Sequence, residues 1–196
     1  SHEGLDIDLV IESTGFFTER NKAENHIKAG AKKVLISAPA KNPDFTVVYG
    51  VNDSELSDDH KIISNASCTT NCIVPVLRAL DQSFGVLSGV ITTIHSAMND
   101  QPVIDSYHNS DLRKTRSAMQ SIIPVDTELA RGIERILPHL QGLLKAQAIR
   151  VPTVNVSAMD LTVSLKRSAT SEQINEALRD FASELPPNVL GVSDEL

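Results

Sequence analysis

Short apolar runs alternate with helical segments in the first third of the chain. Residues 7–11, 33–37 and 46–51 form three such runs, whose length and composition are typical of strands buried on both faces of a parallel sheet. Residues 19–29 carry apolar side chains at helical spacing and end before Gly30, which suits the left-handed position that closes a helix. This alternation predicts an α/β fold with a parallel sheet and crossover helices.

The pattern changes near residue 68. Apolar residues then recur at helical spacing to residue 84, with Ser67 placed to cap the helix and Gly85 placed to end it. Pro75 falls about two turns inside this helix, where it removes a backbone hydrogen bond. A β-branched run at residues 90–94 predicts the next strand.

Two later segments also carry periodic patterns. Residues 154–158 alternate in one register and residues 161–165 in the opposite one, so we expect a bulge or break near residue 159. Residues 170–173 resemble a capping box, which predicts that a helix begins there. The second part of the chain is therefore expected to mix helices and strands.

Length and charge narrow the class of protein. The chain has 196 residues, enough for one large domain or two small ones, and a formal net charge of −7. General nucleic-acid binding needs a basic surface, which an acidic chain does not offer. The first residues lack the basic and apolar regions of a signal peptide, and no apolar run approaches the ~20 residues of a membrane span. We expect a soluble, cytoplasmic protein without nucleic-acid or membrane partners.

Cys68 stands where an extended run, residues 61–64, gives way to the predicted helix. Backbone N–H groups and the positive end of a helix dipole stabilise an anion, so a thiol in the first turn ionises more readily than a free one. This position predicts a nucleophile. A buried cysteine without a chemical role is an equal alternative from the local sequence, because free cysteines are among the most buried residues.

Cys72 follows four residues later on the same face of the helix, so a disulfide or half of a metal site is also conceivable. Zinc normally takes four ligands, and the chain has neither a second cysteine pair nor a His-x-x-x-His group. Two cysteines make no disulfide framework, which fits a reducing compartment. We expect no metal site and interpret Cys72 as a packing residue.

His95 ends the predicted strand, 27 residues after Cys68. One strand-helix-strand excursion can bring the two side chains together, so a thiolate–imidazolium pair with His95 as the base is a hypothesis. A structural hydrogen-bonding role is the alternative for a lone histidine. The remaining histidines, His26 among them, stand in polar or terminal contexts and are expected to be solvated.

Cations offer a second candidate site. Arg113, Lys114 and Arg116 lie within four positions of a loop-like stretch, and guanidinium groups match phosphate oxygens in paired geometry. Solvated surface charge is the alternative for these three residues. Arg150 lies between apolar residues in a strand-like setting, where a cation usually has a partner.

Polar residues and a glycine follow the first two predicted strands. Ser13, Thr14 and Gly15 follow the first strand, and Ser37 ends the second. Ligands of parallel sheets bind beyond the carboxyl ends of the strands, so these residues are expected to hold a nucleotide. Simple turn chemistry is the alternative, and no Gly-x-Gly-x-x-Gly fingerprint identifies the nucleotide as a dinucleotide.

Four segments, taken in order, resemble one enzyme family. They are residues 64–72, 93–96, 122–124 and 150–156, with the sequences SNASCTTNC, TIHS, IIP and RVPTVNV. Together they are similar to the glyceraldehyde-3-phosphate dehydrogenase family of phosphorylated-aldehyde dehydrogenases, through essentially the whole chain. Residues 95–101 and 123–127 are more similar to the members that oxidise erythrose 4-phosphate, with Met98 where the glyceraldehyde enzymes typically have a threonine.

The resemblance implies a mechanism. Cys68 attacks the aldehyde carbon to give a hemithioacetal, His95 takes the hydroxyl proton as hydride leaves for NAD, and a thioester remains. Water mainly resolves this thioester in the erythrose enzymes, which supply 4-phosphoerythronate to pyridoxal phosphate synthesis, whereas inorganic phosphate does so in the glycolytic enzymes. The implied substrate-binding residues are Ser67, Thr69, Arg113, Lys114, Thr127 and Arg150. The implied NAD-binding residues are Ser13, Thr14, Gly15, Phe17 and Ser37.

The resemblance also implies the domain organisation. Residues 1–67 correspond to the C-terminal part of a Rossmann-type NAD-binding domain, and residues 68–196 to an incomplete α+β catalytic domain with an antiparallel or mixed sheet. The family's N-terminal βαβ unit and its C-terminal segment with a nicotinamide-binding asparagine have no counterpart, so we expect an internal fragment with little turnover alone. Homotetramers are usual in the family. A non-catalytic redox or binding role is the remaining alternative.

Overall fold

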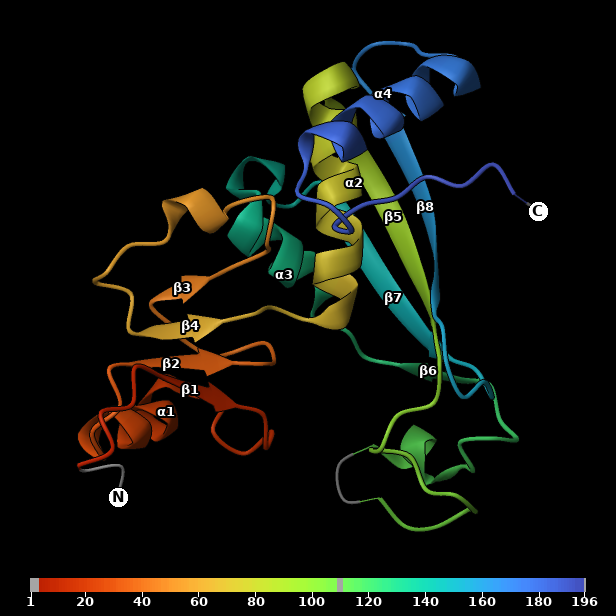
Figure 1. Ribbon diagram of the computed structural model, residues 1–196. Helices are drawn as coiled ribbons and strands as arrows, with labels where there is room; N and C mark the ends of the chain where they lie inside the picture. Colours follow the sequence, from red (N-terminus) through yellow and green to blue (C-terminus); the bar gives the residue numbers. More distant parts are fainter. Residues whose placement is uncertain (1–3, 109–110, 196) are drawn as a thin grey trace.

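The computed structural model describes residues 4–108 and 111–195, and within them the chain forms two four-stranded sheets with helices around them (Figure 1). The first sheet is entirely parallel, with the strand order β1-β2-β4-β3. Its strands are β1 (Leu9–Glu12), β2 (Lys33–Ile36), β3 (Phe45–Thr46) and β4 (Ile62–Ser64), and helix α1 (Arg20–Lys28) connects β1 to β2. The predicted parallel sheet with its crossover helix is confirmed.

The first sheet has a small core on the face that α1 covers, where Ala23 and Val34 are fully buried. Gly30 follows the end of α1 with a φ of 110°, as predicted for the residue that closes the helix. The expectation that the first strand is buried on both faces is wrong. Leu9 and Ile11 are 46% and 63% exposed, because β1 is an edge strand and α1 covers only one of its faces.

The strand predicted at residues 46–51 is wrong beyond its start, because β3 has only two residues and the chain then turns. Asn52 organises this turn: its Oδ1 accepts from the Val48 N–H at 2.8 Å, and its Nδ2 donates to the Thr46 carbonyl at 3.0 Å. Gly50 has a φ of 79°, a left-handed conformation that glycine adopts readily. In this turn the Asn52 side chain therefore takes hydrogen bonds that a longer β3 would make with a neighbouring strand.

The second sheet is mixed, with the strand order β6-β7-β5-β8. β5 pairs in parallel with β7, while β8 is antiparallel to β5 and β6 is antiparallel to β7. The strands are β5 (Val86–His95), β6 (Ile123–Val125), β7 (Leu144–Arg150) and β8 (Ala158–Leu165). The expected mixed sheet is confirmed, and the strand predicted at residues 90–94 lies inside β5.

In the described part of the chain, α2 and α3 pack on one face of the second sheet, and α4 packs against α2 (Figure 1). These helices are α2 (Cys68–Phe84), α3 (Leu129–Ile136) and α4 (Ser171–Glu184), and the short 3-10 turns are η1 (Asp53–Glu55), η2 (Leu112–Thr115) and η3 (Pro138–Leu140). As predicted, Ser67 caps α2, Gly85 ends it, and Thr170 opens α4 with a capping box. None of the described helices is long and apolar enough to cross a membrane.

Helix α2 lies between the two sheets and carries the main core (Figure 1). Leu77 of α2 is fully buried with Ile91 of β5 and Ile133 of α3. Val48, from the turn after β3, belongs to the same core, so both parts of the chain contribute to it. Pro75 is buried within α2, and the helix continues through it.

The change of phase before β8 lies in a loop. Burial alternates along the whole of β8, so the bulge or break predicted near residue 159 is wrong. Val154 and Val156 lie in the preceding loop, are 82% and 77% exposed, and do not share a strand with β8. The register of β8 on β5 is irregular elsewhere, between Val86 and Ser88.

Candidate active site

The first sheet brings polar residues to one of its edges. The carboxyl ends of β1, β2 and β4 meet there because these neighbouring strands are parallel. Residues 13–15 and Phe17 follow β1, Ser37 follows β2, and β4 leads into α2, which begins at Cys68. The structure therefore collects the expected cofactor-binding residues at the edge from which the candidate nucleophile emerges.

Cys68 is exposed at the start of α2, and His95 is the last residue of β5. His95 Nε2 lies 3.6 Å from Cys68 Sγ. His95 Nδ1 lies 2.8 Å from the Ser96 carbonyl oxygen and must be the donor, since a carbonyl only accepts. In a neutral imidazole the lone pair is then on Nε2, facing the thiol. The pair is arranged for proton transfer from sulfur to nitrogen.

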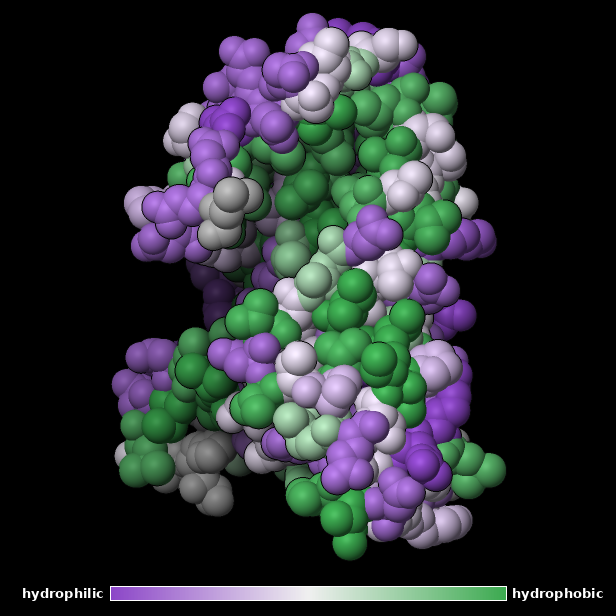
Figure 2. Space-filling view, turned by 90° about the vertical axis from the view of Figure 1, so that its right-hand side faces the viewer, coloured by the Kyte–Doolittle hydropathy of each residue, from purple (hydrophilic) through white to green (hydrophobic). Residues whose placement is uncertain are grey.

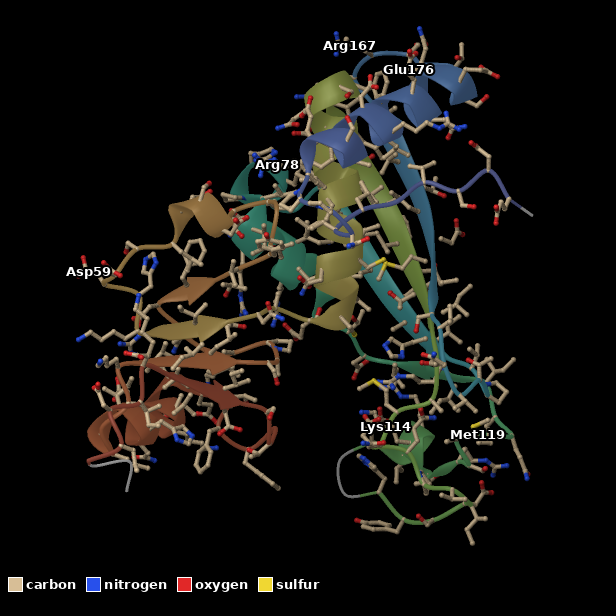
Figure 3. The ribbon with its side chains drawn as sticks, in the orientation of Figure 1. Asp59, Arg78, Lys114, Met119, Arg167 and Glu176 are labelled. Carbon is tan, nitrogen blue, oxygen red and sulfur yellow. The ribbon has the colours of Figure 1, made fainter. Side chains whose placement is uncertain are left out.

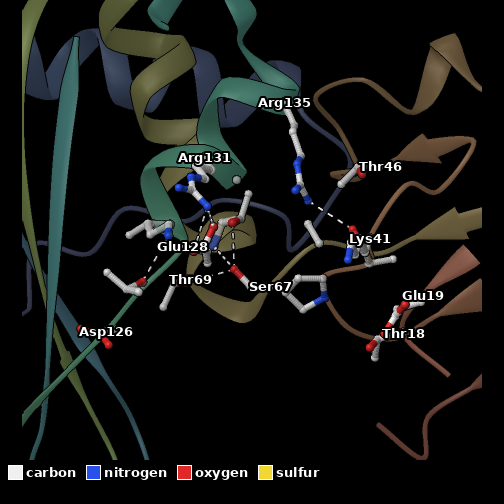
Figure 4. Close-up of a pocket in the computed structure, with 17 residues that line it drawn as sticks. Thr18, Glu19, Lys41, Thr46, Ser67, Thr69, Asp126, Glu128, Arg131 and Arg135 are labelled. Atoms are coloured by element: carbon white, nitrogen blue, oxygen red, sulfur yellow. Dashed lines mark hydrogen bonds and ion pairs between the residues drawn. The ribbon is translucent and has the colours of Figure 1, made fainter. Parts of the chain in front are cut away.

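Hydroxyl groups gather at the start of α2. Ser67 Oγ lies 3.0 Å from Thr69 Oγ1 and 2.8 Å from Thr70 Oγ1, and it accepts from the Thr70 N–H. Ser67 and Thr69 are the chain neighbours of Cys68, and both line a cavity of about 480 Å³ (Figure 4). Thr127 lines the same cavity. Three of the expected substrate-binding residues thus share one cavity, which Cys68 itself does not line.

Arg150 ends β7 and pairs in register with His95, so the two residues are neighbours on the sheet. Its side chain is 11% exposed, and its Nη1 lies 3.7 Å from Asp100 Oδ1 without a hydrogen-bond partner among the described residues. Lys114, at the foot of the second sheet in Figure 3, donates to Asp100 Oδ2 at 2.6 Å. A buried guanidinium with unused donor capacity beside the imidazole is suited to bind a phosphate oxygen.

Asp100 holds these two cations together. Burial raises the pKa of its carboxyl group, but the hydrogen bond from Lys114 and the charge of Arg150 outweigh burial and hold the pKa below the usual 3.8. Asp100 is therefore ionised at neutral pH. Its role is missed by sequence reasoning, because an aspartate in an irregular loop carries no local signal of the cations that fold back onto it.

Arg113 is paired elsewhere. Its Nε and Nη2 donate to Asp111 at 3.0 and 3.1 Å, and its Nη2 also lies 3.0 Å from Asp126 Oδ2. The hydrogen bonds to these two carboxylates raise the pKa of Arg113 further. Arg116 pairs with Asp105 at 3.3 Å. Among the described contacts of the three loop cations, it is Lys114 that pairs with Asp100, the partner of Arg150.

Glu12 is a second residue that sequence reasoning missed. It is 4% exposed, its Oε1 accepts from the Thr14 N–H and hydroxyl at 2.7 and 2.5 Å, and its Oε2 lies 3.0 Å from His26 Nε2. Burial raises the pKa of Glu12, but the hydrogen bonds from Thr14 and His26 hold it below the usual 4.5. The expectation that His26 is solvated is wrong, because its ring also packs edge-on against Phe17.

Both thiols are exposed, so the interpretation of Cys72 as a packing residue is wrong, but their surroundings differ. Burial, and then the neighbouring Cys68, raise the pKa of the Cys72 thiol above its usual 9.0. Cys72 therefore keeps its proton at neutral pH. Among residues 4–108 and 111–195, no group of three or more His, Cys, Asp or Glu side chains is placed to hold a metal ion.

Comparison with protein-family models identifies the family of the second part of the chain. The family model described as "Glyceraldehyde 3-phosphate dehydrogenase, C-terminal domain" matches residues 67–196. The matched part includes α2, the whole second sheet, the Cys68–His95 pair and Arg150. Since the match spans more than half of the sequence, the chain belongs to the glyceraldehyde-3-phosphate dehydrogenase family.

Proposed function

We propose that the protein is an NAD-dependent dehydrogenase that oxidises D-erythrose 4-phosphate to 4-phosphoerythronate. The observation that carries the proposal is the 3.6 Å contact between Cys68 Sγ and His95 Nε2, with Nδ1 fixed as a donor to a carbonyl. Oxidation of an aldehyde through a thioester needs a nucleophile and a base within reach of each other, and this pair supplies both.

The Cys68 thiol gives its proton to His95 Nε2, the thiolate forms a bond to the aldehyde carbon, and the carbonyl oxygen takes that proton to give a hemithioacetal. His95 Nε2 takes the hydroxyl proton as hydride leaves that carbon, a contribution typically worth about 10²–10⁴ in rate. NAD, when bound, supplies the oxidising chemistry by accepting the hydride. A thioester on Cys68 remains, and an acyl acceptor releases the product and restores the thiolate.

Arg150 and Lys114 are proposed to bind the substrate phosphate, with Asp100 as the residue that positions them. The unpartnered Nη1 of Arg150 and its place beside His95 support this assignment. The family usually has an arginine at position 114. Lysine keeps the charge but lacks the planar fork of a guanidinium, so the paired contact falls to Arg150.

The residues proposed to hold NAD are Ser13, Thr14, Gly15, Phe17 and Ser37. They fit a ligand at the carboxyl edge of parallel strands. No heavy atom lies within 4 Å of the point where a Cβ on Gly15 would stand, so the backbone is open to a ligand. The Glu12 carboxylate fixes Thr14 in this loop through two hydrogen bonds. The edge therefore offers both room and an ordered backbone.

Met98 supports the choice of erythrose 4-phosphate. Met98 is 44% exposed and stands two residues before Asp100 in the chain. It offers no hydroxyl where the glyceraldehyde enzymes typically have a threonine. The loss of one hydrogen bond to phosphate alters how a three-carbon substrate is held. Oxidation of glyceraldehyde 3-phosphate is the alternative function, and the cation pair at Arg150 and Lys114 suits it equally.

Steady-state turnover of the full-length protein with erythrose 4-phosphate and with glyceraldehyde 3-phosphate, each with and without inorganic phosphate, tests the proposal. We expect a kcat/KM at least about tenfold higher for erythrose 4-phosphate, and no turnover by the Cys68→Ser variant. A preference for glyceraldehyde 3-phosphate would establish the alternative. Absence of NADH formation from both aldehydes would leave a redox or binding role.

The proposal includes the organisation of the enzyme. Residues 1–67 are proposed to form part of a Rossmann-type NAD-binding domain, and residues 68–196 to form the catalytic domain. We also propose a homotetramer. Apolar side chains remain exposed on the face of the second sheet turned away from α2, with Val90 50% and Ile94 37% exposed, and Figure 2 shows apolar residues gathered on this side of the molecule. Such a face supports association of subunits.

A further inference from the structure

An acyl acceptor can approach the Cys68 thioester from the cavity that both chain neighbours of Cys68 line, although Cys68 itself is not among the lining residues. The cavity lies between α3 and the loops of the first sheet (Figure 4). Its lining includes three carboxylates and three cations, namely Glu19, Asp126, Glu128, Lys41, Arg131 and Arg135. The formal charges of these side chains cancel.

The cations next to the hydroxyl cluster are already engaged. Arg131 Nη1 donates to both carboxylate oxygens of Glu128, at 3.2 and 2.9 Å. Arg135 donates to the Ala40 carbonyl at 3.2 Å and so bridges α3 to the first sheet. An anion that enters the cavity meets Arg131 only after it has competed with a carboxylate held beside it.

The carboxylates flank Thr127 on both sides in the chain, and all three residues line the cavity. The side chains of Asp126 and Glu128 are 94% and 72% exposed, Asp126 in an ion pair with Arg113 and Glu128 in an ion pair with Arg131. Inorganic phosphate carries more than one negative charge at neutral pH and is repelled by such groups, whereas water is neutral and is not.

We infer that Glu128, supported by Asp126, excludes inorganic phosphate from this cavity, so that water is the acyl acceptor. The inference deepens the proposed function and rests on its thioester. The oxygen of water bonds to the acyl carbon, the carbon–sulfur bond breaks, and Cys68 leaves as a thiolate. His95 first releases the proton from the oxidation step to solvent, and its Nε2 then accepts the proton that water gives up. Glu128 does not touch the reacting atoms; it determines which acceptor reaches them.

Binding of inorganic phosphate tests the inference without any turnover. Titration calorimetry at constant ionic strength compares the wild-type protein with Glu128→Gln and Glu134→Gln. Glu134 lies in α3, whose N-cap position is Glu128, accepts from the Gly142 N–H and does not line the cavity, so its variant is a matched loss of charge. We expect Glu128→Gln to bind phosphate about five- to tenfold more tightly than the other two proteins. Equal affinity in all three would overturn the inference.

A second variant shows where phosphate binds in Glu128→Gln. Adding Thr127→Val to Glu128→Gln removes a hydroxyl of the cavity and is expected to abolish the tighter binding. If the gain persists without that hydroxyl, phosphate binds elsewhere and the inference is wrong.

Turnover separates the inference from the proposed function. With an aldehyde that the protein oxidises, phosphate is expected to accelerate Glu128→Gln and to leave the wild-type protein and Glu134→Gln unchanged. Phosphate-accelerated turnover of the wild-type protein would overturn the inference while the dehydrogenase function stands. If no protein oxidises either aldehyde, the proposed function fails, and the calorimetric result still decides whether Glu128 excludes phosphate.

Discussion

At the scale of single residues, two thiols one helical turn apart are expected to react differently. Burial and the neighbouring thiol raise the pKa of Cys72, whereas Cys68 faces His95 Nε2. Iodoacetamide at pH 7 should therefore modify Cys68 first, with Cys72 following slowly, because the thiolate is the reactive form. Mass spectrometry of peptides from a time course measures both rates in one sample.

The variants His95→Asn and Cys72→Ser separate the causes of this reactivity. Loss of the imidazole is expected to slow modification of Cys68 about tenfold or more, because the thiol loses the group that takes its proton. Cys72→Ser is the matched control and should leave the Cys68 rate nearly unchanged. Equal rates in the wild type and in His95→Asn would show that the pair is structural.

Glu12 predicts a dependence of stability on pH. Burial acts against the carboxylate, yet hydrogen bonds from Thr14 and His26 hold its pKa below 4.5. Since the folded-state pKa is lower than the unfolded one, the carboxylate stabilises the fold above about pH 4.5, and this stabilisation is lost as the pH falls through the folded-state pKa. Glu12→Gln should lower the free energy of unfolding at pH 7 by about 1–3 kcal/mol.

Urea unfolding at pH 7 and at steps between pH 5 and 3 measures the effect. The wild-type protein should lose more stability over the acid range than Glu12→Gln does. Glu24→Gln is the control, since Glu24 pairs with Arg20 on the surface of α1 and its loss should cost at most about 0.5 kcal/mol. Parallel acid profiles for the wild type and Glu12→Gln would contradict the prediction.

Residues with a local signal could be found from the sequence, and residues defined by distant partners could not. Cys68 was singled out by its place at a helix start, and Arg150 by a charge in an apolar setting. Glu12 and Asp100 gave no such signal. Thr14 is a near neighbour of Glu12, but His26 and Lys114 each stand 14 positions after the carboxylate they contact, and Arg150 of β7 lies farther along the chain from Asp100.

At the scale of elements, α2 and α3 approach each other closely at Thr70 and Gly132. A Cβ on Gly132 of α3 would stand 2.6 Å from Thr70 Oγ1, and that oxygen bonds to Ser67 Oγ. Gly132→Ala must therefore push Thr70 away from the cap of α2. We expect a loss of about 1–3 kcal/mol in the free energy of unfolding from overpacking, which exceeds the gain of about 1 kcal/mol that alanine brings to a helix.

A double-mutant cycle with Thr70→Ala isolates this contact. Thr70→Ala removes the atom that Gly132→Ala would meet. The loss in free energy of unfolding of the double variant should therefore be smaller than the sum of the two single losses. Strictly additive losses, or a Gly132→Ala protein about 1 kcal/mol more stable than the wild type, would show that the helices can move apart freely.

The elements themselves were predictable where one face is buried and the ends are capped. Ser67 and Thr170 marked the starts of α2 and α4 correctly, because capping is a local interaction. The strand predicted at residues 46–51 ends early because the Asn52 side chain, outside the apolar run, hydrogen-bonds to backbone groups of the turn. The break before β8 was misplaced because Val154 and Val156 mimic a strand although they are exposed in a loop.

At the scale of the whole molecule, the main core contains residues from both parts of the chain, before and after residue 68. Val48 from the first part packs with Leu77 of α2 and Ile133 of α3. Arg78 of α2 also donates to the Val51 carbonyl in the same turn, and Figure 3 shows it on the side of α2 that faces that turn. The candidate active site lies at this junction, so its geometry depends on contacts between the two parts. The apolar pattern of each part showed a core, but no pattern showed that the turn after β3 belongs to the core around α2.

The exposed face of the second sheet gives a prediction for the assembly. Val90 lies on the central strand β5, 50% exposed, with Lys145 opposite it on β7. In Val90→Glu the new carboxylate can pair with Lys145 across the strands, so the fold of one subunit should tolerate it. Between subunits the carboxylate and Lys145 would both be taken out of water, and the cost of this desolvation exceeds the gain from their pairing. We expect the full-length variant to be dissociated in sedimentation velocity while the wild type is tetrameric.

Two controls make this result specific to the sheet face. Val90→Ile keeps an apolar β-branched side chain and should remain tetrameric. Leu56→Glu places the same charge at another partly exposed apolar position, 39% exposed just after η1, and should leave the assembly unchanged. The apolar side chains on β5 lie next to His95 along the strand, so an interface there would also restrict the movement of the active-site end of the sheet. A wild-type protein that sediments as a monomer at all concentrations, or a Val90→Glu protein that stays tetrameric, would show that this face has no role in assembly.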